Sequence, residues 1–365
     1  MELVFTWCGG LFFAILHNYS HVHFQWPIKI NKTLEALYAE HINGKIKCHL
    51  CPHLCLIAEG KTGVCRVRRN VNGTLFAETW GNISALHKDP IEKKPLYHYF
   101  PGNSILSIGS VGCNMRCRCC QNWQISQAGT EEYQFERQLT PDEILHIAIS
   151  DKDNLGVAYT YNEPGMWFEY MMDIARLSNK NGLKNVMVSN GFINESPLED
   201  LMQYIDAFNI DLKGFTETFY RSFTGASLAP VLQTLKQIRN AGRHLEVTCL
   251  IVPTRNDDPV EFNKMIDWIE KELGNKTVLH LSRYHPAFKL GIEPTAAADM
   301  EALLTIARRK LYHVYAGNIQ LKDYQDTKCS NCGKVVIKRT GYNIDIMGLN
   351  ETGNCRHCGN KEIIC

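Results

Sequence analysis

The chain has 365 residues, of which 45% are hydrophobic and 21% charged, a composition typical of a globular protein with one large domain and small satellites. Its 39 basic and 38 acidic residues leave a net charge of +1, which gives no reason to expect binding to nucleic acid or to an anionic membrane. The 15 cysteines are odd in number and stand in metal-like spacings, which argues against a disulfide framework and for a reducing compartment such as the cytosol.

Residues 1–32 are expected to form an N-terminal extension, or to reflect a misassigned start, rather than a domain. Residues 4–16 are largely apolar, but this run of about 13 residues falls short of the roughly 20 needed to cross a bilayer. Glu2 is the only charged residue before the run, and no clear small-residue cleavage pattern follows, unlike in a signal peptide. We therefore expect no membrane segment and a cytoplasmic protein.

Residues 33–100 are interpreted as a Cys-rich N-terminal module. The pattern C-x2-C-x3-C-x9-C supplies four thiols, with two histidines interleaved. Zinc or a second Fe–S cluster would fit this pattern equally well, whereas buried free cysteines would act only as small hydrophobic residues. We favour a metal site, and its candidate ligands are Cys48, Cys51, Cys55 and Cys65.

Two short basic runs also fall in this module, at residues 66–69 and 93–94. Runs of this length more often form solvated faces than binding patches, so we interpret both as exposed surface.

Residues 113–120 carry the most specific motif of the chain. Cys113, Cys117 and Cys120 have the spacing C-x3-C-x2-C. Three thiolates this close together can hold three irons of a [4Fe–4S] cluster, whose preferred ligand set is four cysteines. The fourth iron then lacks a protein ligand, and an open metal position is typical of a catalytic site. A zinc site with Cys119 as fourth ligand is a weaker interpretation, because adjacent cysteines rarely bind one tetrahedral ion.

Residues 101–325 alternate between short apolar runs and helical patterns, which predicts an α/β fold with a curved or closed parallel sheet. Thr140 followed by Pro141 predicts the start of one helix. Apolar residues from Phe262 to Leu273 share one face of another helix, and Gly242 is expected to end a third. Strands are predicted at 104–110, 156–161, 185–190, 207–213, 244–252, 277–284 and 313–317.

Polar motifs follow most of these predicted strands. In barrels built from βα units, the chemistry lies at the carboxyl ends of the strands. Each motif alone would be read as a loop residue, a helix cap or a surface pair. Their presence at successive strand ends instead predicts one shared site, formed by Cys113, Asn162, Glu163, Ser189, Asn190, Asp211, Lys213 and His285.

Residues 326–365 are interpreted as a zinc-ribbon-like tail. Two C-x2-C knuckles are separated by 22 residues, and each is followed by a glycine that allows a tight turn. Such a short tail has too little apolar surface to fold without the contribution of a metal ion. Zinc is the favoured ion, with a rubredoxin-like iron as the alternative. The predicted ligands are Cys329, Cys332, Cys355 and Cys358.

The three-cysteine motif, with Gln121-Asn122-Trp123 after it, resembles the signature of the radical SAM superfamily. The resemblance implies a partial (βα)6 barrel and a [4Fe–4S] cluster whose free iron binds the amino and carboxylate groups of S-adenosylmethionine (SAM). The residue before the third ligand is usually aromatic in the superfamily, and here it is Cys119.

The resemblance also implies contacts to SAM. The turn with Asn162 and Glu163 looks like the family's Gly-Gly-Glu position, which holds the methionyl ammonium. Asp211 and Lys213 match the Asp-Leu-Lys of pyruvate formate-lyase activating enzymes, where the lysine faces the SAM carboxylate and the acid faces the amine. The remaining implied contacts are Ser189 and Asn190 with the ribose or methionyl group, Ile251 and Val252 over the adenine, and His285 near the ribose.

Further segments at 48–55, 63–68, 89–98 and 315–318 resemble the radical SAM member of the AmmeMemoRadiSam system. The resemblance covers residues 35–365 and implies association with a Memo-like protein and an AMMECR-type protein, but no substrate. A low-potential electron donor of the flavodoxin or ferredoxin type is implied as well.

The sequence thus predicts a radical SAM oxidoreductase that forms a 5′-deoxyadenosyl radical and abstracts hydrogen from an unidentified substrate. A closely related alternative is an activase that places a radical on a glycine of a partner enzyme. An alternative of another class is a non-catalytic binding module stabilised by metals. That module would explain the flanking cysteines but would leave Glu163, Asp211 and Lys213 without a role.

Overall fold

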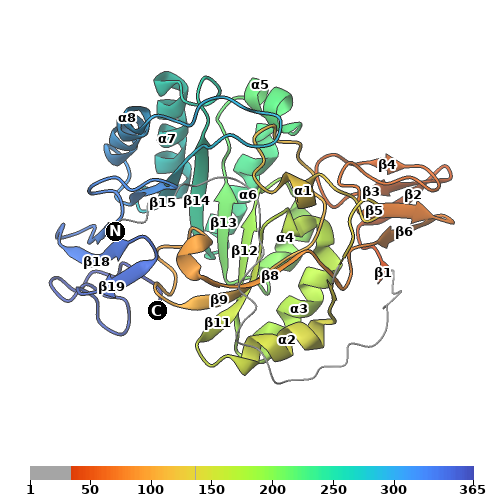
Figure 1. Ribbon diagram of the computed structural model, residues 1–365, viewed down its shortest axis with the longest axis horizontal. Coiled ribbons are helices and arrows are strands. Elements are labelled where there is room, and N and C mark those ends of the chain that lie inside the picture. Colours follow the sequence, from red (N-terminus) through yellow and green to blue (C-terminus); the bar gives the residue numbers. More distant parts are fainter. Residues whose placement is uncertain (1–33, 136) are drawn as a thin grey trace, which may run out of the picture. The chain divides into compact units, whose positions relative to one another are not determined.

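The computed structural model describes residues 34–135 and 137–365, which belong to one compact unit. Its centre is an eight-stranded sheet in the order β16-β15-β14-β13-β12-β11-β9-β8 (Figure 1). Neighbouring strands from β9 to β16 run parallel, and β8 is antiparallel to β9 at one edge. The edge strands β8 and β16 do not pair with each other, so the sheet is an open, partial barrel. The strands are β8 (Ala85–Pro90), β9 (Ser104–Gly109), β11 (Asn154–Tyr159), β12 (Lys184–Ser189), β13 (Ala207–Asp211), β14 (His244–Ile251), β15 (Val278–Arg283) and β16 (Val314–Gly317).

Helices connect the parallel strands, and the first long one begins where the sequence predicts. The Thr140 hydroxyl accepts the N–H of Glu143, whose carboxylate accepts the N–H of Thr140, and Pro141 occupies the first helical position. The alternation of strands and helices confirms the predicted α/β barrel. The long helices are α2 (Pro141–Ser150), α3 (Phe168–Lys180), α4 (Glu195–Met202), α6 (Leu228–Asn240), α7 (Pro259–Leu273) and α8 (Ala297–Arg308), and the short ones are η1 (Ile91–Lys93), α1 (Trp123–Ser126), η2 (Pro164–Trp167), α5 (Glu217–Phe219) and η3 (Tyr220–Thr224).

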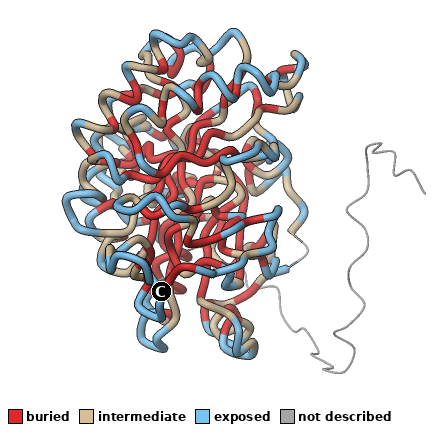
Figure 2. The backbone as a smooth tube through the Cα atoms, turned by 90° about the vertical axis from the view of Figure 1, so that its left-hand side faces the viewer, coloured by how far each residue is buried: buried red, intermediate tan, exposed pale blue. Residues whose placement is uncertain are grey.

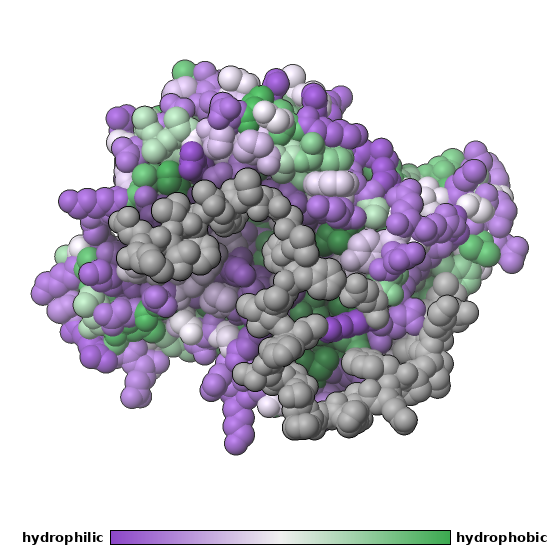
Figure 3. Space-filling model, in the orientation of Figure 1, coloured by the Kyte–Doolittle hydropathy of each residue, from purple (hydrophilic) through white to green (hydrophobic). Residues whose placement is uncertain are grey.

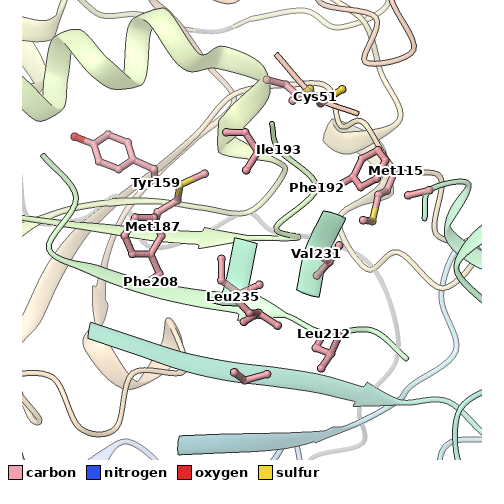
Figure 4. Packing of buried hydrophobic residues seen from close by; sticks show 14 of the residues in the cluster. Cys51, Met115, Tyr159, Met187, Phe192, Ile193, Phe208, Leu212, Val231 and Leu235 are labelled. Atoms are coloured by element: carbon pink, nitrogen blue, oxygen red, sulfur yellow. The ribbon is translucent and has the colours of Figure 1, made fainter. Parts of the chain in front are cut away.

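Amphipathic helices cover the outer face of the sheet. The Asp258 carboxylate caps α7 by accepting two backbone N–H groups, and Gly242 follows α6 with a φ of 68° that favours glycine. Buried residues concentrate along the central strands (Figure 2). Figure 4 shows Met187 and Phe208 of neighbouring strands close to Leu235 of α6. The buried face of α7 is the predicted one and consists of Phe262, Met265, Ile266, Ile269 and Leu273.

The N-terminal segment forms two small antiparallel sheets, with the orders β1-β6-β5 and β2-β3-β4. Its last strand, β8, belongs to the barrel sheet, so this segment contributes directly to the wall of the barrel. The predicted divisions at residues 100 and 325 stay predictions. The small strands are β1 (Leu34–Glu35), β2 (Ala39–Ile42), β3 (Lys45–Cys48), β4 (Leu56–Ile57), β5 (Arg68–Val71), β6 (Thr74–Ala77), β7 (Asn82–Ile83) and its partner β10 (Arg137–Gln138).

The C-terminal tail is a three-stranded sheet of β17 (Thr327–Lys328), β18 (Val335–Thr340) and β19 (Asn343–Ile346). It packs on the residues that precede β9, because Phe100 donates its N–H to the carbonyl of Ile364 at 2.7 Å.

The interpretation of the two basic runs as exposed surface is wrong for Arg68 and Lys94, whereas Lys93 is exposed and Arg66 is partly exposed. The Arg68 side chain is 1% exposed and lies 3.0 Å from the Glu169 carboxylate, and Lys94 is 2% exposed and lies 2.7 Å from Asp89. The partner of Arg68 is 101 residues away, which local sequence patterns do not reveal, whereas Asp89 lies only 5 residues before Lys94.

Charged and polar groups make up much of the visible surface (Figure 3). No described helix is long and apolar enough to cross a membrane. The predicted extension at residues 1–32 lies outside the described residues.

Candidate active site

A cavity of about 430 Å³ opens at the carboxyl ends of the barrel strands. It collects the polar motifs that follow successive strands, as expected when parallel strands end at the same edge of a sheet. Ile251 and His285 are not among the residues that line it. The predicted site residues that do line it are Cys113, Cys117, Cys120, Asn162, Glu163, Ser189, Asn190, Asp211, Lys213 and Val252.

The loop with the three cysteines directly follows β9. The Met115 N–H donates to the Cys113 sulfur at 3.3 Å, and the Ser126 hydroxyl lies 3.0 Å from the Cys120 sulfur. Burial raises the pKa of Cys113 well above its ordinary value and the pKa of Cys117 to about 12. Thiols in such surroundings become thiolates when a bound metal supplies positive charge. The donor set therefore fits an iron–sulfur cluster held by Cys113, Cys117 and Cys120.

Glu163 organises the next wall of the cavity. Its carboxylate accepts the Ser189 hydroxyl at 2.8 Å, the Asn190 N–H at 2.8 Å and the Gly165 N–H at 3.0 Å. The Asn190 side-chain amide in turn lies 3.7 Å from the Cys113 sulfur. Burial raises the pKa of Glu163, although its hydrogen bonds oppose this shift. A cationic ligand beside this carboxylate would favour its charged form.

Asp211 and Lys213 form an ion pair at the end of β13, with 2.8 Å between the Asp211 Oδ2 and the Lys213 Nζ. Burial lowers the pKa of Lys213, but the neighbouring Asp211 and Cys117 raise it, and the result lies well above the ordinary value. The ammonium is therefore charged and lies in the same cavity as the cysteine loop, where it can bind an anionic group.

Several lining residues were not predicted from the sequence. Asp89, Lys93 and Lys94 come from β8 and the turn after it, and Tyr161 follows β11. The run Asp89–Lys94 stood out in the sequence, but only as part of a family resemblance. Its position in the cavity depends on the antiparallel pairing of β8 with β9, and no local sequence pattern predicts this pairing.

The four cysteines of the C-terminal tail meet at one point. Their sulfurs all lie within 4.8 Å of one another, with 3.5 Å between Cys329 and Cys358 and 3.7 Å between Cys332 and Cys355. Tetrahedral zinc with Zn–S bonds of about 2.3 Å would place its sulfurs about 3.8 Å apart. The predicted grouping is confirmed, and these residues could hold one metal ion.

The four N-terminal cysteines line a second small cavity beside the buried Arg68. In the described part of the chain they do not form a group as tight as that of the tail, because no three of their sulfurs lie within 4.8 Å of one another. The predicted convergence is present, and a metal at this place stays a prediction. The residues are Cys48, Cys51, Cys55 and Cys65.

The amino-acid sequence of this chain is similar to those of known proteins. A model described as the Radical SAM superfamily matches residues 107–269. The uncharacterized protein MJ0808 of Methanocaldococcus jannaschii is 41% identical over 331 residues, which are 90% of this chain and 98% of that protein. The pyruvate formate-lyase-activating enzyme of Clostridium pasteurianum is 26% identical over 215 residues, 55% of this chain and 85% of that enzyme.

Among solved structures, a radical SAM methyltransferase from Sphaerobacter thermophilus aligns with a TM-score of 0.48 at 12% identity. The alignment covers 65% of this chain and 71% of that chain.

Proposed function

Because the chain belongs to the radical SAM superfamily, we propose that it is a radical SAM enzyme that abstracts hydrogen from an unidentified substrate. When bound, a [4Fe–4S] cluster and SAM supply a 5′-deoxyadenosyl radical through one-electron reductive cleavage of SAM. One observation carries the proposal. The three cysteines of the C-x3-C-x2-C loop line the same cavity as Glu163 and the Asp211–Lys213 pair.

The residues of the chain would bind and orient the two groups. Cys113, Cys117 and Cys120 would hold three irons and leave one iron accessible from the cavity. Glu163 would accept the methionyl ammonium of SAM, and Lys213 would donate to its carboxylate.

The remaining implied contacts stay proposals. Asn162, Ser189, Asn190 and Val252 line the cavity, which supports contacts to SAM. Ile251 is fully buried and its carbonyl accepts the Thr295 hydroxyl at 2.6 Å, so any role near the adenine would be through packing.

Anaerobic reconstitution with iron and sulfide tests the proposal. Reduction with dithionite in the presence of SAM should release 5′-deoxyadenosine, even without substrate. Replacing Cys113, Cys117 or Cys120 by Ala should abolish this release and the bound cluster, whereas Cys119→Ala should leave both largely intact. A Cys119→Ala protein as inactive as the other three would show that the ligand assignment is wrong.

A glycyl-radical activase is the second candidate, supported by sequence similarity to activating enzymes of pyruvate formate-lyase and benzylsuccinate synthase. The benzylsuccinate synthase activating enzyme of Thauera aromatica is 22% identical over 155 residues, 41% of this chain and 47% of that enzyme. An activase incubated with its partner enzyme, SAM and a reductant would produce a glycyl radical detectable by electron paramagnetic resonance. A non-catalytic module would bind neither SAM nor a redox-active cluster.

A groove beside the cysteine loop supports the proposal that a protein electron donor docks on this chain. It has a volume of about 690 Å³, and its wall includes Arg116, Arg118 and Lys289. Glu132 also lines the groove and lies 3.7 Å from Arg66, and among the described residues no ion pair within 4.0 Å is found for Arg116, Arg118 or Lys289. Arg116 and Arg118 flank the proposed ligand Cys117, so a carrier bound here would lie next to the cluster. We propose that an acidic low-potential carrier of the flavodoxin or ferredoxin type docks in this groove.

Charge reversal tests the docking groove. Arg118→Glu should slow 5′-deoxyadenosine formation about tenfold with reduced flavodoxin as donor, since rim charges act mainly on association. Dithionite needs no docking. With dithionite as reductant, the variant and the wild type should therefore form 5′-deoxyadenosine at the same rate per amount of protein. Lys276→Glu is the matched control, because this exposed lysine lies in a separate basic groove before β15. Equal slowing by both reductants would argue against docking at this site.

The two flanking cysteine sites and further partners complete the proposal. Zinc is the proposed ion of the tail, supported by the sulfur distances, and zinc or an Fe–S cluster remains open for the N-terminal site. Association with a Memo-like and an AMMECR-type protein is proposed from sequence resemblance alone, and co-purification from a native source would test it.

A further inference from the structure

Four polar side chains in the wall of the active-site cavity have no role in the proposed binding of the cluster or SAM. Asp89, Lys93 and Lys94 come from β8 and the turn that follows it, and Tyr161 follows β11. We call these four residues the Asp89 cluster. It lies along the β8 edge of the open barrel, whereas the proposed SAM contacts follow β11 to β14.

The Asp89 carboxylate joins the cluster through three hydrogen bonds. It accepts the Lys93 ammonium at 3.0 Å, the Lys94 ammonium at 2.7 Å and the Tyr161 hydroxyl at 2.6 Å. Lys94 also lies 4.7 Å from the centre of the Tyr161 ring. Burial opposes ionisation of Asp89, but Lys94, Tyr161 and Lys93 hold the pKa of Asp89 well below its ordinary value. Burial lowers the pKa of Lys94, and the Asp89 carboxylate opposes this shift. The Asp89 carboxylate thus contacts two lysine side chains.

The backbone around Tyr161 is strained to place this side chain. Tyr161 has a φ of 72°, which is unfavourable for an aromatic residue. Its ring lies against Gly109, where an added Cβ would come within 3.0 Å of the Tyr161 ring and 3.1 Å of the Thr160 carbonyl. Asn122, two residues after Cys120, donates to the Tyr161 carbonyl at 2.7 Å. Tyr161 is thus hydrogen-bonded both to the segment after the cysteine loop and to Asp89.

The charges of the Asp89 cluster indicate what it could bind. Two ammonium groups share one carboxylate, which leaves one net positive charge facing the cavity. The Lys93 side chain is 49% exposed, so it can turn toward a ligand, while Lys94 is held in place by burial. Lys213, which pairs with Asp211, is already assigned to the SAM carboxylate in the proposed function. A carboxylate or phosphate group would neutralise the excess charge and could accept hydrogen bonds from Lys93 and Lys94.

We propose that the Asp89 cluster is the substrate-binding part of the cavity and recognises an oxyanion, a carboxylate or a phosphate, on a small-molecule substrate. The inference rests on the proposed radical SAM function and adds the chemical class of the substrate. It disfavours a protein glycine as the hydrogen donor, because a peptide glycine carries no such group.

Binding of defined small molecules tests the inference without relying on catalysis. Reconstituted holoprotein with SAM would be dialysed to equilibrium against three probe mixtures, namely phosphate esters, carboxylic acids without phosphate, and uncharged sugars and alcohols. Mass spectrometry would measure which compounds the protein enriches. We expect enrichment from one of the two anionic mixtures, and the mixture concerned distinguishes phosphate from carboxylate. Enrichment of uncharged compounds only, or of none, would overturn the inference.

Variants locate the binding at the Asp89 cluster. Lys93→Gln should reduce the enrichment at least about tenfold, since it removes a charge-assisted hydrogen bond to the oxyanion. It should still fold, because it keeps the buried contacts of Asp89 with Lys94 and Tyr161. Lys88→Gln is the matched control, because exposed Lys88 lies on β8 five residues before Lys93, pairs with Asp151 and does not line the cavity. Equal enrichment by wild type and Lys93→Gln would refute the assignment.

A second readout separates this inference from the proposed function. A protein-free metabolite extract would be divided on an anion exchanger, and each fraction tested for its effect on 5′-deoxyadenosine release. The stimulating fraction should be retained by the exchanger, and the ratio of rates with and without it should fall toward 1 in Lys93→Gln. Stimulation only by compounds that the exchanger does not retain would refute the inference alone. Failure of reduced wild type to release 5′-deoxyadenosine would instead refute the proposed function.

Discussion

At the scale of single residues, Glu163 carries much of the proposed chemistry. Its side chain is 3% exposed, and its carboxylate accepts three donors from the ends of β11 and β12. An ionised carboxylate offers about four lone-pair sites, so it can accept a further donor such as an ammonium group. The contacts to Ser189 and Asn190 fix its orientation beside the cysteine loop. Glu163 is therefore held ready for a cation before any ligand arrives.

Replacing Glu163 by Gln should weaken SAM binding about 10- to 100-fold, because a hydrogen bond to a charged group contributes about 1.5–3 kcal/mol. Equilibrium dialysis of the reconstituted protein with SAM measures the change. Glu199→Gln is a suitable control, because Glu199 is exposed on α4. Unchanged SAM affinity in Glu163→Gln would remove this residue from the proposed site.

At the scale of elements, Glu246 connects the start of β14 to its surroundings. Its fully buried carboxylate accepts the N–H groups of Tyr97 and His98 at 2.9 and 2.7 Å, and it lies 2.7 Å from His280 of β15. It also lies 2.9 Å from His244. The chain segment before β9 is thereby fastened to the amino ends of two barrel strands.

Glu246→Gln should lower the free energy of unfolding by about 3 kcal/mol at pH 7, because it removes one partner of a buried charged network. Burial opposes the charge, but His244 and His280 hold the pKa of Glu246 well below its ordinary value of 4.5. A lowered folded pKa stabilises the fold above pH 4.5, and this contribution disappears as the pH falls below that value.

Urea unfolding at several pH values measures this effect. The difference between wild type and Glu246→Gln should be largest at neutral pH and should shrink below about pH 4.5. Glu261→Gln, which affects only a surface pair on α7, should change stability by less than about 1 kcal/mol. A constant difference across the pH range would contradict the assigned role of the Glu246 charge.

At the scale of the whole molecule, the C-terminal tail and the catalytic cavity lie at different ends of the barrel. Arg339 of β18 donates to the Tyr97 carbonyl at 2.9 Å, and Glu362 lies 3.3 Å from His313, which precedes β16. These contacts are at the amino ends of the strands. The cysteine loop and its cavity are at the carboxyl ends, so the tail does not contribute to the lining of the cavity.

Cys358→Ala should therefore release about one metal ion and loosen the tail, since tetrahedral closure needs four ligands. Elemental analysis and limited proteolysis measure these two effects. Release of 5′-deoxyadenosine without substrate should continue. Cys365→Ala, which removes an exposed free thiol, should retain the metal. Loss of SAM cleavage in a Cys358→Ala protein with a normal iron content would contradict this separation of roles.

Much of the fold and part of the site follow from short-range signals. Helix starts such as Thr140 depend on hydrogen bonds within a few residues, and the apolar face of α7 depends on the helical period, so both are visible in the sequence. The cysteine spacings are equally local, which is why the grouping of the four tail cysteines was predictable, while the cluster ligands at 113–120 stay a prediction. The parallel sheet then brings the predicted strand ends together at one edge.

Only the tertiary structure determined where β8 lies and which residues contact the charged side chains of β8 and the turn after it. Lys94 looks like a surface residue in the sequence, yet it is buried against Asp89 and Tyr161. Its position depends on the antiparallel register of β8 with β9 and on the positive φ of Tyr161, and neither has a local signal. The sequence by itself thus determined the grouping of the tail cysteines and the succession of the barrel strands, because spacing and periodicity are encoded within a few turns of chain. The tertiary structure determined the shape and charge of the proposed substrate wall, because these arise from contacts between segments about 70 residues apart, such as Asp89 and Tyr161.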